Sequence, residues 1–269
     1  MGRIVTLTTD FGLADEFVGV MKGVILGVAP SARIVDLTHQ VAPHDVRHAA
    51  FLLAAAWPFF PAGTVHLAVV DPGVGSARRL VALEAAGQLF LAPDNGLLSL
   101  VLAANPRARA WRIDNRELYP GRVGATFHGR DILAPVAARL AGGVDPDQVG
   151  PALAVADLLR LPDLEPSVDG ASGRITGRVE QVDRFGNLVT NIGADLLREL
   201  GGDGGRAGLR IQCGGREVRG LAGTFSDLPA GVPLALIGSR GCLELAVNQG
   251  RAEEVLAAGV GYQVTVKKE

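Results

Sequence analysis

The chain has 269 residues, of which 48% are hydrophobic and 20% charged, so it can bury the core of one large domain or of two ordinary ones. A net charge of −2, with no long run of like charges, argues against a nucleic-acid partner. The longest apolar run, residues 49–60, is too short to span a bilayer and contains Pro58, so no membrane partner is expected.

The N-terminal half alternates strand and helix patterns. Strands are predicted at residues 4–9, 33–38 and 64–70, where short apolar and β-branched runs end at turn signals. Helices are predicted at 17–28, with one apolar stripe along its length, and at 45–57. This β-α-β-α-β order predicts an α/β domain with a mainly parallel, Rossmann-like sheet and right-handed crossovers.

The chain then continues with shorter elements. A hairpin is expected over residues 79–84 and 88–92, and a strand over 111–114. Helices are expected at 97–104, with Asp94 as a candidate cap, and at 132–140.

Three predicted strands end in polar residues, namely Asp10, His39 and Asp71. Open α/β sheets bind ligands at the carboxyl ends of their strands, so these side chains are expected to share a pocket. Asp71 begins a tight Pro- and Gly-containing loop that brings Arg78 after it. A purely structural ion pair between Asp71 and Arg78 is the alternative interpretation.

His128 stands in the segment TFHGRD, directly before a predicted helix. Backbone N–H groups and the helix dipole at that position favour anions and lower the pKa of a histidine. His128 is therefore a candidate functional residue, although an isolated histidine is often only structural.

The C-terminal half has a different pattern. The predicted organisation is an α/β domain at residues 1–160, a linker at 161–173 and a smaller C-terminal β-barrel domain at 174–269. Residues 201–208 are expected to form a flexible loop. The barrel strands are predicted at residues 175–182, 187–192, 209–213, 217–221, 233–237, 243–247 and 262–266.

Two polar clusters lie between these strands. One spans residues 183–191 and the other residues 238–241. Both are consistent with ordinary turns. The first also places Phe185 beside amide side chains, a combination that can stack on a purine and hydrogen-bond to its edge.

Several function classes lack their signatures. There is no G-x-G-x-x-G after the first strand, no P-loop and no G-x-S-x-G, which argues against a Rossmann dinucleotide site and a serine hydrolase. Four histidines (His39, His44, His48 and His66) with Asp10 and Asp71 raise the possibility of a metal phosphoesterase. The pair at 44 and 48, predicted on a helix, has no third ligand of clear spacing, so no metal is expected.

Other features bear on location. The two cysteines, Cys213 and Cys242, match no metal spacing and favour a reducing, cytoplasmic setting. The N-terminus lacks the basic segment and cleavage site of a signal peptide.

A set of short motifs, taken together and in order, resembles the S-adenosyl-L-methionine (SAM) hydroxide adenosyltransferases, adenosine-forming SAM hydrolases related to the SAM-dependent fluorinase and chlorinase. The resemblance covers the whole chain. The motifs are LTTDFG (7–12), MKG (21–23), VDPGVG (70–75), PDNG (93–96), TFHGRD (126–131), FGN with TNI (185–192) and LELAVN (243–248).

This resemblance implies an N-terminal α/β domain, a C-terminal β-barrel domain and a homotrimer. It implies that SAM is the substrate, bound between the N-terminal domain of one subunit and the C-terminal domain of the next. Adenosine and L-methionine are then the products, and no cofactor is required.

The resemblance also assigns residues to roles. It implies that Asp71, Arg78 and His128 are catalytic and that Asp10 holds the ribose hydroxyls. The remaining substrate-binding positions are Phe127 in the N-terminal domain, Phe185 and Asn187 around adenine, and Asp183, Ser239 and Arg240 at the methionine end.

The related halogenases place Tyr at the position of Asp71 and lack His at that of His128, and the long insertion typical of the fluorinase is missing here. These differences favour water over halide as the nucleophile. The Ser239-Arg240 pair is closer to the halogenase version of its turn, which leaves the methionine contacts open. A SAM halogenase and a non-catalytic SAM- or adenosine-binding sensor are the alternatives.

Overall fold

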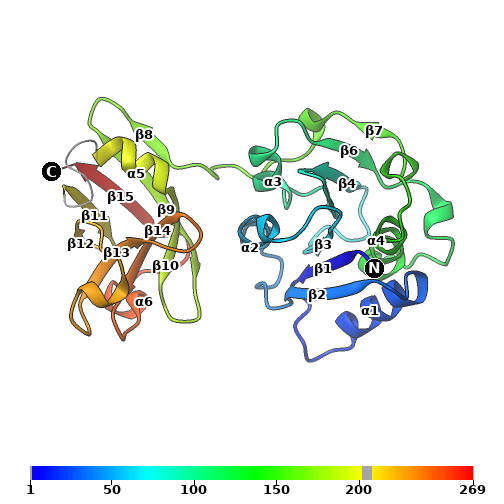
Figure 1. Cartoon of the computed structure of the whole chain (residues 1–269), viewed down its shortest axis with the longest axis horizontal. Coiled ribbons are helices and arrows are strands. Elements are labelled where there is room, and N and C mark those ends of the chain that lie inside the picture. Colours follow the sequence, from blue (N-terminus) through cyan, green and yellow to red (C-terminus); the bar gives the residue numbers. More distant parts are fainter. Residues whose placement is uncertain (1, 202–207, 269) are drawn as a thin grey trace. The chain divides into compact units, whose positions relative to one another are not determined.

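The computed structural model describes residues 2–201 and 208–268, so most of the loop predicted at 201–208 lies outside the described residues. The chain forms two compact units, Met1–Pro162 and Asp163–Glu269 (Figure 1). This confirms the fold class predicted from the sequence, an α/β domain followed by a smaller β-barrel domain.

The N-terminal unit is built on a seven-stranded sheet in the order β2-β1-β3-β5-β4-β6-β7. Its first four strands in that order are parallel to one another, whereas β4 pairs antiparallel with both β5 and β6. The strands are β1 (Ile4–Thr9), β2 (Arg33–Thr38), β3 (Val65–Val69), β4 (Leu80–Ala85), β5 (Gln88–Pro93), β6 (Arg109–Arg112) and β7 (Ala152–Leu153).

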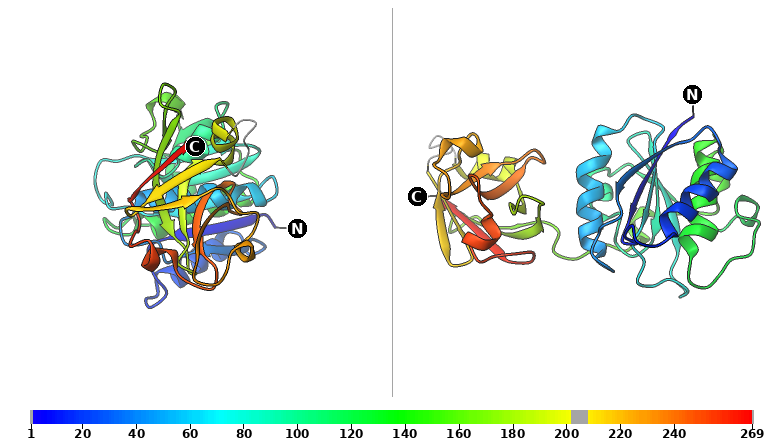
Figure 2. Two further views of the ribbon diagram at one scale, coloured as in Figure 1. Left: turned by 90° about the vertical axis from the view of Figure 1, so that its left-hand side faces the viewer. Right: turned by 90° about the horizontal axis from the view of Figure 1, so that it is seen from below.

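Helices cover both faces of this sheet (Figure 2). α1 (Phe17–Val28) and α4 (Ala134–Ala141) pack on one face, and α2 (Val46–Ala56) and α3 (Ser99–Ala104) on the other. In β3, Leu67 and Val69 join the core under α1 and α4, while Ala68 joins the opposite core. Because the strand is buried on both faces, its sequence is a continuous apolar run rather than an alternating one.

Two local predictions in this unit need correction. The apolar stripe of α1 is only partly buried, because Met21 and Ile25 are fully buried but Phe17 is 39% exposed. Asp94 does not cap α3. Its carboxylate instead accepts hydrogen bonds from Nε of Arg79 and from the backbone N–H of Leu159. Asp94 therefore links the segment at Leu159 to this turn.

The segment before α4 also differs from expectation. Gly129–Leu133 forms a π-helical turn that leads into α4, so the helical region begins earlier than the predicted residue 132. π-turns of this kind occur often at functional sites. Within the described residues, single 3₁₀ turns also occur at Trp57–Phe59, Arg116–Leu118, Pro146–Gln148, Val155–Asp157 and Phe225–Asp227.

The C-terminal unit is a nearly closed, antiparallel barrel in the order β12-β11-β15-β9-β10-β14-β13, with β8 paired to β9. Ala222 bridges to Leu236 near the two edge strands. α5 (Ala194–Gly201) and α6 (Ala252–Val255) were not predicted. The strands are β8 (Ser167–Asp169), β9 (Arg174–Val182), β10 (Leu188–Gly193), β11 (Leu209–Cys213), β12 (Arg216–Arg219), β13 (Pro233–Ile237), β14 (Cys242–Val247) and β15 (Gln263–Lys268).

Candidate active site

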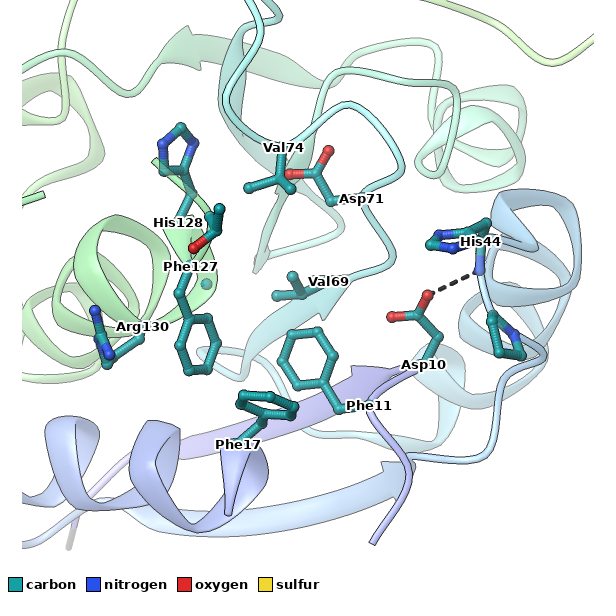
Figure 3. Close-up of a pocket in the computed structure, with 13 residues that line it drawn as sticks. Asp10, Phe11, Phe17, His44, Val69, Asp71, Val74, Phe127, His128 and Arg130 are labelled. Carbon is teal, nitrogen blue, oxygen red and sulfur yellow. Dashed lines mark hydrogen bonds between the residues drawn. The ribbon is translucent and has the colours of Figure 1, made fainter. Parts of the chain in front are cut away.

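A cavity of about 580 Å³ lies at the carboxyl ends of β1 and β3 in the N-terminal unit (Figure 3). Asp10 directly follows β1, and Asp71 follows β3 after one residue. Parallel strands end at the same edge of their sheet, which is why these two carboxylates meet at one cavity. The lining residues are Asp10, Phe11, Phe17, Pro43, His44, Val69, Asp71, Val74, Thr126, Phe127, His128, Gly129 and Arg130.

His39, the third polar residue at a strand end, does not line this cavity. Its ring is 4% exposed, with Nδ1 2.8 Å from the Thr9 hydroxyl and Nε2 3.0 Å from a carboxylate oxygen of Asp36. Its backbone carbonyl accepts the N–H of Gly12 at 2.7 Å. The prediction of a shared pocket is therefore wrong for His39, which instead fastens the loop that carries Asp10.

Arg78 connects Asp71 to His128. Its Nε lies 2.6 and 2.8 Å from the two carboxylate oxygens of Asp71, and Nη2 bonds the same carboxylate. The same Nη2 lies 3.0 Å from Nδ1 of His128. The side chains of Asp71 and Arg78 are only 7% and 9% exposed. The ion pair expected as the structural alternative exists, and it also extends to the histidine.

Arg78 itself is not among the residues that line the cavity. It contacts the cavity wall through Asp71 and His128, which both line it. A guanidinium offers five N–H donors. Three are used here, while the two on Nη1 have no partner among the described residues.

The pKa of His128 is lowered below 6.5, as the sequence predicted, but the main causes differ from the predicted helix N-terminus. Burial of the ring is the largest cause, and the positive charge of Arg78 is the next. Both disfavour the charged imidazolium. The ring is therefore neutral near pH 7.

His44 is a site residue that the sequence analysis misplaced. Its backbone has φ 68°, and its N–H donates to Oδ2 of Asp10 at 2.9 Å (Figure 3). It lies before α2, which Asp45 caps by accepting the N–H of His48, so His44 and His48 do not share a helix. The second carboxylate oxygen of Asp10 has no hydrogen-bond partner in the described part of the chain.

Three aromatic rings form one wall of the cavity. Phe127 meets Phe11 and Phe17 edge to face, with ring centroids 5.7 and 5.4 Å apart. The guanidinium of Arg130 lies 5.0 Å from the centroid of the Phe127 ring. Of this group only Phe127 was predicted as a site residue. Phe17 follows the apolar period of α1, so its sequence pattern predicted a core position.

The predicted residues of the C-terminal unit lie around a second cavity and the turn beside it. Phe185, 75% exposed, and Asn187 line a cavity of about 560 Å³. Asp183 accepts the N–H groups of both residues and the side-chain amide of Asn187, and so holds their loop. Ser239 is exposed, and Arg240 hydrogen-bonds Gln181. Phe225, Asn248 and Arg251 also line the cavity and were not predicted.

Over residues 2–201 and 208–268 the structure presents neither a metal-binding cluster nor a membrane-spanning helix. No group of three or more His, Cys, Asp or Glu side chains there is placed to hold a metal ion. No helix in the same ranges has the length and apolar character needed to cross a membrane.

The architecture is that of a two-domain protein with a small-molecule cavity at the edge of an α/β sheet. Comparison with known families makes the assignment specific. Residues 5–150 match the SAM hydroxide adenosyltransferase N-terminal domain, and residues 177–265 match the C-terminal domain of the same family. This chain therefore belongs to the SAM hydroxide adenosyltransferase family.

Relatives match over almost the full length. The (R)-S-adenosyl-L-methionine hydrolase of Salinispora tropica is 43% identical over 97% of each chain, and that of Thermus thermophilus is 42% identical over 97% of this chain and 98% of its own. A fluorinase of Actinoplanes sp. is 32% identical over 98% of this chain and 97% of its own. A crystal structure of an uncharacterized conserved protein from Thermotoga maritima superposes with a TM-score of 0.91, at 40% identity over 98% of this chain and all of its own.

Proposed function

We propose that this protein hydrolyses (R)-S-adenosyl-L-methionine to adenosine and L-methionine by SN2 attack of water or hydroxide at C5′ of the ribose. The contact of Arg78 with both Asp71 and His128 at the cavity is the observation that carries the proposal. The proposal is also supported by the similarity of this chain, at 42–43% identity, to proteins that are named (R)-S-adenosyl-L-methionine hydrolase.

In this reaction an oxygen–C5′ bond forms and the C5′–sulfur bond breaks. The bonding electron pair goes to sulfur, so methionine leaves as a neutral thioether, and one proton leaves the attacking water. A positive sulfonium and a negative hydroxide neutralise each other in the transition state, so a dry, preorganised cavity favours attack once hydroxide is present.

Formation of the nucleophile is the difficult step, because the pKa of bulk water is about 15.7. In the proposed division of roles, the positive charge of Arg78, held against the cavity-lining Asp71 and His128, stabilises the developing hydroxide. Asp71 holds the guanidinium in place by a bidentate contact. His128 accepts or relays the proton.

The rest of the proposed site holds the substrate. The free carboxylate oxygen of Asp10 is the acceptor for the ribose hydroxyls, and Phe127 forms an apolar wall. Phe185 and Asn187 contact adenine. The methionine end lies against Asp183, Ser239 and Arg240.

The assembly and setting are also proposals. SAM is the substrate, and no cofactor takes part. We propose a homotrimer in which the substrate binds between subunits, with a mass in light scattering about three times the 27.9 kDa of one chain. Cys213 and Cys242 are both free thiols, which supports a reducing, cytoplasmic setting.

The identity of the product tests the reaction. Metal-free protein is incubated with SAM in the absence and presence of chloride or fluoride, and the products are separated by chromatography. We expect adenosine and methionine under every condition. A 5′-halo-adenosine would instead assign the protein to the halogenases, to which the 32% identical fluorinase belongs. Tight binding of SAM without any product would support a sensor.

A further inference from the structure

The loop at residues 71–78 begins with Asp71 and ends with Arg78, so its conformation determines where both proposed catalytic groups lie. Within the loop, the N–H of Val74 donates to the carbonyl oxygen of Asp71 at 3.2 Å, which orders its first turn. The two ends of the loop must be held by other segments of the domain. Those segments therefore decide how the two side chains are placed at the cavity.

The turn at residues 93–96, with the sequence PDNG, holds the first end of this loop. Nδ2 of Asn95 donates a hydrogen bond to the carbonyl oxygen of Val70 at 2.8 Å. Val70 is fully buried and directly precedes Asp71, and a buried carbonyl needs a donor because water cannot reach it. Oδ1 of Asn95 accepts the N–H of Leu97 at 3.2 Å, and this second bond fixes the orientation of the amide.

The same turn holds the second end of the loop. The backbone N–H of Asp94 donates to the carbonyl oxygen of Arg79 at 2.9 Å, and its carboxylate accepts the Nε–H of Arg79 at 2.8 Å. Arg79 directly follows Arg78. Asp94 is 6% exposed, and its other carboxylate oxygen accepts the N–H of Leu159, so the carboxylate is fixed from two sides. One turn thus holds both ends of the loop that carries Asp71 and Arg78.

The tip of the loop contacts the segment that leads to His128. Gly75 has φ 82°, and a Cβ at this position would lie 2.7 Å from the carbonyl oxygen of Ala125, so only glycine permits the approach. Ala125 is three residues before His128, whose Nδ1 lies 3.0 Å from Nη2 of Arg78. A shift at the base of the loop therefore changes how Asp71 and Arg78 lie relative to His128.

We infer that Asn95 and Asp94 are positioning residues, which set the geometry of Asp71 and Arg78 at the cavity from the other side of the loop. Neither is among the residues that line the cavity, so each acts through the loop. Such support matters because a misplacement of 1 Å can lower a catalytic rate by about 10²-fold. The inference rests on the proposed function and gives the PDNG turn a part in it.

Asn95→Ser tests the inference in the full-length protein. The serine hydroxyl can still accept the N–H of Leu97, but it is too short to reach the carbonyl of Val70. We expect kcat for SAM to fall by about 10-fold or more. The dissociation constant of adenosine should stay within about 3-fold, because Asp10 is held by a different loop. Rates are measured below the melting transition of the variant, where a merely structural role would leave kcat at its wild-type value.

Asn105→Ser is the matched control. Nδ2 of Asn105 donates to the carbonyl oxygen of Val101, also at 2.8 Å, so it makes the same kind of hydrogen bond at the far end of α3. Its loss should leave kcat at the wild-type value. An equal fall of kcat in Asn95→Ser and Asn105→Ser would overturn the inference, and so would a wild-type kcat in Asn95→Ser.

Arg79→Gln tests the second end of the loop, and it provides a measurement even if Asn95→Ser does not fold. The Arg79 side chain is 32% exposed, so its replacement disturbs the core little, yet it removes the ion pair with Asp94. We expect kcat to fall here too, with the affinity for adenosine unchanged. Arg109→Gln, which removes an exposed ion pair with Glu84, is the control. A wild-type kcat in Arg79→Gln would overturn the part assigned to Asp94.

A spectroscopic readout separates this inference from the proposed reaction. Release of adenosine from SAM by wild type tests the reaction alone. The ¹⁵N resonance of Nδ1 in His128 reports the hydrogen bond from Arg78 without any turnover. Asn95→Ser should move this resonance towards that of a ring nitrogen without a donor, while Asn105→Ser should leave it at the wild-type position. An unmoved resonance in Asn95→Ser would contradict the inference whether or not SAM is hydrolysed.

Discussion

Nη2 of Arg78 donates a hydrogen bond to Nδ1 of His128 across 3.0 Å. A guanidinium has no acceptor and stays protonated, so Nδ1 must supply a lone pair and the neutral ring carries its proton on Nε2. In this arrangement the basic nitrogen of His128 is occupied by Arg78. For His128 to take a proton from water, that hydrogen bond must be released, which couples the proposed base to the group that stabilises hydroxide.

Replacement of His128 tests its part in proton transfer. His128→Ala should lower kcat by about 10²-fold or more if the ring is a general base, because that is the usual contribution of such a group. The measurement is the rate of adenosine release at saturating SAM. A near-normal rate would remove His128 from this role.

The pH profile of the wild type gives a second readout for His128. Because its pKa is lowered below 6.5, the ring is neutral at pH 7 and becomes charged only in more acid solution. Activity should therefore be constant from neutral pH down to the lowered pKa and then fall. A profile whose acid limb is unchanged in His128→Ala would assign that limb to another group.

Arg78→Lys tests the geometry of the guanidinium apart from its charge. Lysine cannot make the bidentate contact with Asp71 and the hydrogen bond to His128 at once. We expect kcat/KM to fall by about 10²-fold, comparable to the loss of one preorganised donor. Arg112→Lys is the control, because Arg112 forms an ion pair with Asp114 that is about half exposed. Equal activities of the two variants would contradict a role for the planar guanidinium and its simultaneous contacts with Asp71 and His128.

Asp10 has two separable contacts. One carboxylate oxygen accepts the N–H of His44, and the other is free for the ribose. Asp10→Ala should weaken adenosine binding by about 10-fold or more, since hydrogen bonds to a charged group are lost. Asp10→Asn keeps one acceptor and should lose less. Isothermal calorimetry with adenosine measures both, and an unchanged affinity in Asp10→Ala would exclude the ribose contact.

The buried ring of His66 is expected to make the protein less stable in acid. It is fully buried between Thr6 and Gln88, and burial lowers its pKa from 6.5 to about 4. The His66 ring of the unfolded chain takes up a proton at a higher pH than that of the native state. The contribution of the neutral, buried ring to the free energy of unfolding is therefore complete above pH 6.5 and is lost as the pH falls towards 4. This pKa shift corresponds to about 3 kcal/mol in the free energy of unfolding. NMR titration of the ring should show no protonation near pH 6.5, and a normal pKa there would contradict this.

The arrangement of strands was largely predictable from the sequence. Periodic apolar positions located β1, β2 and β3 within one or two residues, and the order of elements predicted the parallel sheet. The short Gly-bounded strands predicted the barrel. The weak points were α5 and α6, because their length and composition differ little from the surrounding turns.

At the site, the sequence indicated residues that end strands or precede a helix, such as Asp71 and His128. It considered His44 only as a candidate metal ligand on a helix and did not indicate its contact with Asp10, which depends on a positive φ and a backbone N–H. It misplaced Phe17, which has the period of a core residue but lines the cavity. Neither role is encoded in residue type or spacing, because both depend on which distant segments meet.

The sequence by itself determined the two domains' fold classes and the sheet edge at which Asp10 and Asp71 meet, because hydrophobic period and strand ends are local properties. Only the tertiary structure decided that Arg78 bridges Asp71 and His128, that His39 is fastened to Thr9 instead of facing the cavity, and that Asn95 holds the carbonyl of Val70. These are contacts between side chains on separate segments, and their geometry follows from packing and register.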